Sequence, residues 1–95
     1  MQITPIFRAG VTQNVAYTAT AGAVTNVFGA ATSFVRVWVT ADAFVLIGNN
    51  PVATAANGVP VAAKVPEYFI CAPGQKISFI QQSAGGTGYV TECSG

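Results

Sequence analysis

Apolar and polar residues alternate along much of the chain, which is the two-residue period of a half-buried β-strand. The pattern is clearest in residues 34–40, FVRVWVT, where three valines fall on one face and Arg36 and Trp38 fall on the other. Because valine packs well on a pleated surface, we expect the valine face to line the core. Residues 43–48, AFVLIG, show no alternation, which is typical of a strand covered on both faces.

Turn-forming residues divide the rest of the chain into further short strands. The additional predicted strands are 14–20, 23–28, 67–71, 76–82 and 88–93, with at most one short strand within 52–66. Pro73 and Gly74 fit the second and third positions of a type II turn. We therefore expect strand 76–82 to pair back onto strand 67–71 as a hairpin, and residues 83–88 to form a flexible loop before the last strand.

The aliphatic composition also favours strands over helices. Val, Ile and Thr together account for 29 residues, whereas Leu46 is the single leucine. Branching at Cβ restricts a side chain on a helix but suits a pleated sheet. Seven or eight short antiparallel strands are enough for two packed sheets. The predicted fold is therefore a small all-β sandwich, for which a jelly roll is one arrangement.

The chain of 95 residues has the length of about one small domain. We assign residues 13–95 to a single β-sandwich domain. Residues 1–12 are expected to act either as an arm that docks onto a neighbouring subunit or the shell, or as an edge strand of the domain's own sheet. Pro5 supports both readings, because proline lacks an N–H group and is tolerated in sheets chiefly at edges. The first residues show no signal-peptide pattern.

Low charge is the most unusual feature of the composition. Only 7% of the residues are charged, against about 25% in a typical soluble domain. The four basic residues are dispersed, so nucleic-acid binding is not expected. The densest apolar run, 43–47, is far shorter than the roughly 20 residues of a membrane-spanning helix. So small and apolar a domain cannot bury all its apolar side chains, and we expect part of this surface to face another subunit.

The sequence offers little catalytic or metal-binding chemistry. It contains no histidine, which excludes a Ser-His-Asp triad. Asp42 is predicted to be a turn residue, and Glu67 and Glu92 are predicted to be solvent-facing strand positions. Cys71 and Cys93 are too few for a closed zinc site; they form either one disulfide or two free thiols, the state that a reducing cytoplasm favours. No enzymatic activity, metal or cofactor is therefore predicted.

Arginine and tryptophan are enriched where proteins meet, so Arg36 and Trp38 on one strand face suit a partner interface. The predicted interface residues are Ile3, Pro5, Ile6, Phe7, Arg8, Arg36 and Trp38. Exposed aromatic side chains can also stack on sugars, and the candidates for this alternative role are Trp38, Tyr68 and Tyr89.

Residues 43–93 resemble a small virion protein of tailed bacteriophages in their layout. The features that carry the resemblance are VLIG at 45–48, NPVAT at 50–54, VPEYF at 65–69, APGQKI at 72–77 and GGTGYVTE at 85–92. The family is that of capsid decoration, or cement, proteins, which resemble one another in being small β-rich subunits, often trimeric, on the outside of the shell. These motifs include no catalytic signature, and no binding residue of the family is carried over to this chain.

The resemblance implies a structural virion protein that is made in the host cytoplasm and sits on the outer surface of the capsid. Its expected partners are the major capsid protein and its own copies, as a homotrimer. Its expected role is to stabilise the head by bridging adjacent capsid subunits. The alternative hypothesis is a carbohydrate- or receptor-binding sandwich module of a phage tail, since fold alone does not determine function.

Overall fold

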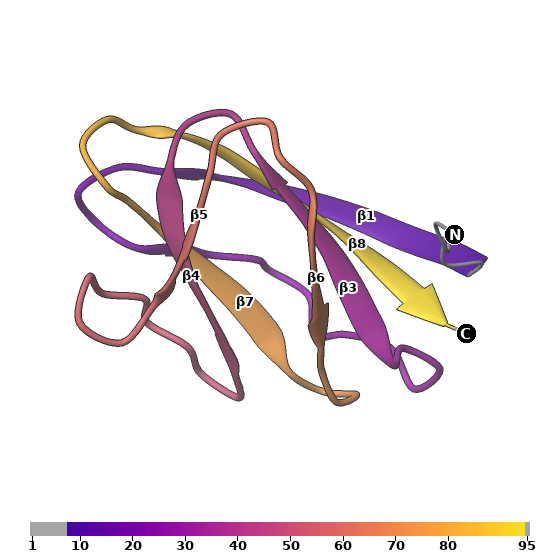
Figure 1. Cartoon of the computed structure of the whole chain (residues 1–95). Coiled ribbons are helices and arrows are strands. Elements are labelled where there is room, and N and C mark those ends of the chain that lie inside the picture. Colours follow the sequence, from indigo (N-terminus) through magenta and orange to yellow (C-terminus); the bar gives the residue numbers. More distant parts are fainter. Residues whose placement is uncertain (1–7, 95) are drawn as a thin grey trace.

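The computed structural model describes residues 8–94, which form eight β-strands and no helix. The strands are β1 (Arg8–Tyr17), β2 (Gly22–Ala23), β3 (Phe34–Val39), β4 (Ala43–Gly48), β5 (Val59–Val61), β6 (Glu67–Ile70), β7 (Lys76–Gln81) and β8 (Gly86–Ser94) (Figure 1). A helix long and apolar enough to cross a membrane is accordingly not found in this part of the chain.

The strands form two antiparallel sheets of four strands each. Sheet A has the order β1-β8-β3-β6, and sheet B has the order β2-β7-β4-β5. The pairs are nested: β1 pairs with β8, β2 with β7, β3 with β6 and β4 with β5. Two facing sheets with this nesting form an eight-stranded jelly roll. The predicted all-β sandwich is thus confirmed.

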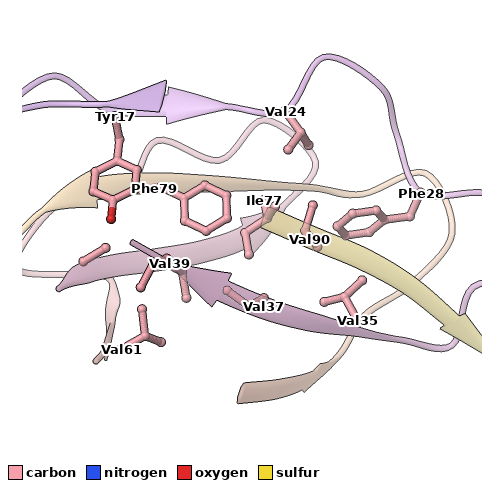
Figure 2. Close-up of a cluster of buried hydrophobic side chains, with 12 residues drawn as sticks. Tyr17, Val24, Phe28, Val35, Val37, Val39, Val61, Ile77, Phe79 and Val90 are labelled. Carbon is pink, nitrogen blue, oxygen red and sulfur yellow. The ribbon is translucent and has the colours of Figure 1, made fainter. Parts of the chain in front are cut away.

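The core lies between the two sheets (Figure 2). Sheet A contributes the predicted valine face of β3, where Val35, Val37 and Val39 are each at most 1% exposed. Sheet B contributes Ile77 and Phe79 from β7, which are fully buried. Burial of one such side chain stabilises the fold by about 1.5–3 kcal/mol. The alternation that predicted β3 therefore also determines which of its faces points inward.

Gly88 on β8 allows sheet A to approach the aromatic part of the core. A Cβ atom at this position would lie only 2.6 Å from Cε2 of Phe79. The Phe79 ring also stacks on Tyr17, with ring centroids 6.0 Å apart. The close approach of backbone and ring requires glycine at position 88.

A loop covers the outer face of sheet B. Within residues 49–58, the backbone N–H of Ala53 donates to the hydroxyl of Ser78 on β7 at 3.0 Å, and Ala53 and Ser78 are both buried. A Cβ atom at Gly58 would lie 2.7 Å from Cβ of Phe44, which shows how closely the loop follows β4. Phe44 and Leu46 on the outer face of β4 remain half-buried, so the prediction that residues 43–48 form a strand covered on both faces is confirmed only in part.

The predicted hairpin between residues 67–71 and 76–82 is wrong, although its turn is correct. Gly74 has a φ of 86°, and the backbone N–H of Gln75 donates to the carbonyl of Ala72 at 3.3 Å. However, β6 pairs with β3 in sheet A, whereas β7 pairs with β4 in sheet B. The backbone twist of a type II turn splays the flanking strands instead of matching the twist of a hairpin. The chain therefore crosses from one sheet to the other at this turn.

The first strand begins earlier than the sequence predicted. β1 runs over Arg8–Tyr17, not over 14–20, and it pairs with β8 across a bulge between Ala9 and Thr12. Its first half lacks apolar alternation because backbone hydrogen bonds to β8, not burial of side chains, hold it in place. Residues 8–12 therefore belong to an edge strand, one of the two roles predicted for 1–12. Residues 1–7 lie outside the described residues.

Two further boundaries differ from the prediction. The strand expected at 23–28 is reduced to Gly22–Ala23. The loop expected at 83–88 ends sooner, because β8 already begins at Gly86. A Cβ atom at Gly86 would lie 2.8 Å from the hydroxyl oxygen of Tyr17. Gly86 and Gly88 are thus needed because neighbouring atoms lie too close for a side chain, not because the chain is flexible there. The glycine content of the segment does not distinguish these two reasons.

Candidate functional site

The outward-facing side chains of sheet A form a surface rich in aromatic residues, which we call the aromatic face. It consists of Thr12 from β1, Phe34, Arg36 and Trp38 from β3, Tyr68 from β6, and Tyr89 and Thr91 from β8. These side chains share one face because they are direct cross-strand partners, such as Trp38 with Tyr89. All of them are half-buried or exposed.

Two pairs of aromatic rings are in contact on the aromatic face. Trp38 and Tyr89 meet edge to face, with ring centroids 5.8 Å apart and an interplanar angle of 62°. Phe34 and Tyr68 meet at 6.3 Å and 50°. Such tilted arrangements are favourable because the positive edge of one ring approaches the negative face of the other. Each pair joins β3 to a different neighbour, so the rings are held by the sheet itself.

A shallow hollow of about 270 Å³ opens on the aromatic face. It is lined by Thr12, Arg36, Trp38, Tyr89 and Thr91. The hydroxyls of Thr12 and Thr91 lie 2.9 Å apart and are hydrogen-bonded to each other. The hollow thus combines two aromatic side chains with two threonine hydroxyl groups and one guanidinium group.

Arg36 is the only charged side chain that the strands of sheet A, within residues 8–94, direct to the outer face. It is opposite Thr91 on one side and Tyr68 on the other. The nearest acidic residues of the sheet face the other way: Glu67 pairs with inward-facing Val37, and Glu92 is buried. The aromatic face therefore carries one positive charge with no carboxylate beside it.

A second surface lies at the open side of the sandwich, between edge strands β5 and β6. We call it the apolar edge, and its cleft of about 260 Å³ is lined by Val45, Leu46, Ile47, Val59, Phe69 and Ile70. Ile70 is 89% exposed and Val59 is 48% exposed. Sequence reasoning missed this surface, although strand 67–71 carries a signal, because large apolar residues occupy both of its faces and leave no polar side for solvent.

Glu92 corrects the prediction that both strand glutamates face solvent. Its side chain is 9% exposed, and Oε1 accepts hydrogen bonds from the backbone N–H of Gly29 at 2.7 Å and from the hydroxyl of Thr32 at 2.5 Å. The alternation of β8 directs Glu92 inward, where the loop before β3 supplies the donors that a buried carboxylate needs. Glu67 is only half-buried, at the edge of the inner face.

The remaining acidic residue behaves as predicted. Asp42 is exposed in the turn between β3 and β4, and its Oδ1 accepts a hydrogen bond from the backbone N–H of Ala63 at 2.7 Å. Its role is to fix a loop. In residues 8–94 no group of three or more His, Cys, Asp or Glu side chains gathers as a metal site would require.

Cys71 and Cys93 are free thiols. Cys71 packs against the core, whereas Cys93 shares the outward register of Phe34 although it is buried. Cys71 directly follows β6 and Cys93 lies on β8, and β3 separates these two strands. Burial raises the pKa of both thiols; the nearby Glu92 carboxylate raises the pKa of Cys71 further.

The structure brings together some of the predicted interface residues. Arg36 and Trp38 are neighbours on the aromatic face, as predicted. Arg8 is not part of that group: it pairs with Ser94 at the start of β1 and lines a separate hollow with Glu92. The other predicted residues, Ile3, Pro5, Ile6 and Phe7, lie outside the described residues. Tyr89 joins Trp38 through register, and Tyr68 lies on the same face beside Arg36.

Comparisons of the chain with protein-family models, with curated proteins and with solved structures found no match.

Proposed function

We propose that this chain is a structural virion protein, a decoration protein that binds the outside of a phage head as a homotrimer and bridges capsid subunits. The observation that carries the proposal is the apolar edge, where Ile70 is 89% exposed on an edge strand. An exposed edge strand with large apolar side chains is a template for association unless a partner covers it. A virion subunit has such partners in its own copies and in the shell.

The arrangement of surfaces supports a closed ring. Ile70 of the apolar edge is the direct cross-strand partner of Phe34, so the apolar edge adjoins the aromatic face. Contact between the apolar edge of one copy and a different surface of the next copy would be heterologous. Heterologous contacts close into rings when the rotation between copies permits it. Bridging would then stabilise the head by mass action, by about 2.7 kcal/mol per site when the free protein is at 100 times its Kd.

The proposal is tested first by the mass of the protein in solution. Light scattering coupled to gel filtration at micromolar concentration should give about three times the chain mass of 9.7 kDa. Immunogold labelling of purified phage particles should then place the protein on the head. A stable monomer with no affinity for capsids would refute the proposal.

A matched pair of variants tests the apolar edge. Ile70→Lys should raise the dissociation constant of the oligomer at least about tenfold, because it places a charge where the partner buries a side chain. Val52→Lys is the control: Val52 is 64% exposed on the loop of residues 49–58 and does not line the cleft of the apolar edge. Equal effects of the two substitutions would show that assembly does not use this edge.

The aromatic face favours a second candidate function, a carbohydrate- or receptor-binding module of a phage tail. Its support is the hollow in which Trp38 and Tyr89 stand beside hydroxyl groups, since ligand sites combine aromatic walls with a few polar groups. Labelling on the tail instead of the head, together with binding on a glycan array, would favour this candidate over the first.

A further inference from the structure

The hollow on the aromatic face holds the parts of a saccharide site on rigid strands. Trp38 and Tyr89 come from adjacent strands β3 and β8 and brace each other edge to face at 5.8 Å. A sugar ring presents a layer of C–H groups that packs against such a ring. Because the pair is already in place, little ordering is needed on binding.

Two hydroxyl groups lie at the same hollow. Thr12 and Thr91 are direct cross-strand partners whose Oγ1 atoms are 2.9 Å apart. A hydroxyl group offers one donor and two acceptor positions, so each keeps hydrogen-bonding capacity after bonding to the other. Thr12 is exposed and Thr91 is half-buried, which leaves this capacity accessible to a ligand.

The charge of the hollow selects among sugars. Arg36 lines it, and no carboxylate of residues 8–94 shares its face of sheet A. The planar guanidinium group carries five N–H donors in a fork that matches a carboxylate. A neutral sugar would leave this charge unmatched, whereas an acidic sugar would use it.

We propose that this hollow binds an acidic saccharide, with a sugar ring against Trp38 and the carboxylate of the sugar on Arg36. The proposal deepens the second candidate function and rests on it. The volume of about 270 Å³ is just below the roughly 300–1,000 Å³ of sites for drug-sized ligands. We therefore expect the site to hold one or two sugar units.

Tryptophan fluorescence is a direct probe, because Trp38 is the single tryptophan of the chain. The full-length protein is titrated with trigalacturonic acid and, separately, with its methyl ester, which has the same rings without the charge. We expect saturable changes in fluorescence with the acid and up to about fivefold weaker binding of the ester, since an exposed ion pair contributes at most about 1 kcal/mol. Binding of the acid should weaken as salt is raised.

Three variants assign the effect to the hollow. Arg36→Gln should weaken binding of the acid about fivefold and leave binding of the ester unchanged. Lys76→Gln is the matched control: it removes the same charge from β7 in the other sheet and should change neither affinity. Trp38→Ala, followed by NMR shifts because it lacks the fluorophore, should weaken both. Unchanged thermal unfolding shows that each variant is folded.

The outcomes separate the two hypotheses. Equal binding of acid and ester overturns the acidic specificity but leaves a neutral carbohydrate module standing. Loss of affinity in Lys76→Gln as large as in Arg36→Gln also overturns it, since only net charge would then matter. If neither trisaccharide binds at millimolar concentration, the acidic-saccharide site is refuted, and the glycan array alone decides the fate of the second candidate.

Discussion

Glu92 connects a loop to the strand that ends the chain. Its Oε1 atom accepts from Gly29 and Thr32, which lie about 60 residues earlier in the sequence: the two hydrogen bonds span separations of 63 and 60 residues. Because hydrogen bonds to a charged group are stronger than neutral ones, this single carboxylate can hold the loop before β3 against β8.

Substitution of Glu92 should separate hydrogen bonding from charge. Glu92→Ala should lower the free energy of unfolding by about 2–3 kcal/mol, because it leaves the two donors without their acceptor. Glu92→Gln keeps an oxygen that can accept both bonds and should cost no more than about 1 kcal/mol. Urea unfolding measures both, and equal losses would show that packing, not the acceptor, matters at this position.

Gly88 should tolerate no side chain while Phe79 is present. Gly88→Ala should lower the free energy of unfolding by about 1–3 kcal/mol, because its methyl group would overlap the Phe79 ring. Phe79→Leu removes the ring and leaves a space that the new methyl group at position 88 can fill. The Gly88→Ala, Phe79→Leu double variant should therefore be more stable than the sum of the two single losses predicts. Strict additivity in urea unfolding would contradict this account.

At the scale of the element, two truncations distinguish the roles predicted for the N-terminal residues. Removal of residues 1–12 deletes the pairs of Arg8, Ala9 and Thr12 with β8 and should lower the melting temperature of the isolated subunit. Removal of residues 1–7 alone should leave all described strands intact and, on the arm hypothesis, abolish assembly or capsid binding.

Calorimetry measures the melting temperature, and light scattering together with capsid binding measures assembly. A truncation of residues 1–7 that kept both full stability and full binding would contradict the arm hypothesis.

The strands were predictable, but their partners were not. Alternation in 34–40 shows that Arg36 and Trp38 share a face, because the period of a strand is local. It contains no information on which sheet a strand joins, and so strand 76–82 was paired with the wrong neighbour. Tyr89 and Thr12 reach the hollow only through the registers of β8 and β1. The composition of the candidate site therefore depends on pairings between residues far apart in sequence.

At the scale of the whole molecule, stability should fall in alkaline solution. Burial raises the pKa of Tyr17, Cys71 and Cys93. As pH rises, the unfolded chain therefore loses these protons first, beginning near the ordinary thiol pKa of about 8.5. The stabilisation is complete below that pH and is lost as pH rises through the higher folded-state pKa values.

Urea unfolding at pH 7 and at pH 10 tests whether stability falls as pH rises. The midpoint should be lower at pH 10, and the decrease should be smaller in a Cys71→Ala, Cys93→Ala double variant, which retains only the contribution of Tyr17. A midpoint that rose with pH, or a decrease unaffected by the two substitutions, would contradict the assignment.

The nesting of the strand pairs has a consequence for how the chain reaches its fold. Strands β4 and β5 enclose the shortest segment, and each further pair, out to β1 with β8, encloses all the pairs inside it. The entropy lost on closing a loop grows with its length, but an inner pair that has already formed shortens the effective loop of the next one. The least costly route therefore runs outward from residues 43–61, and β1 and β8 join last. Folding should be slow, since most pairings wait for contacts between distant residues.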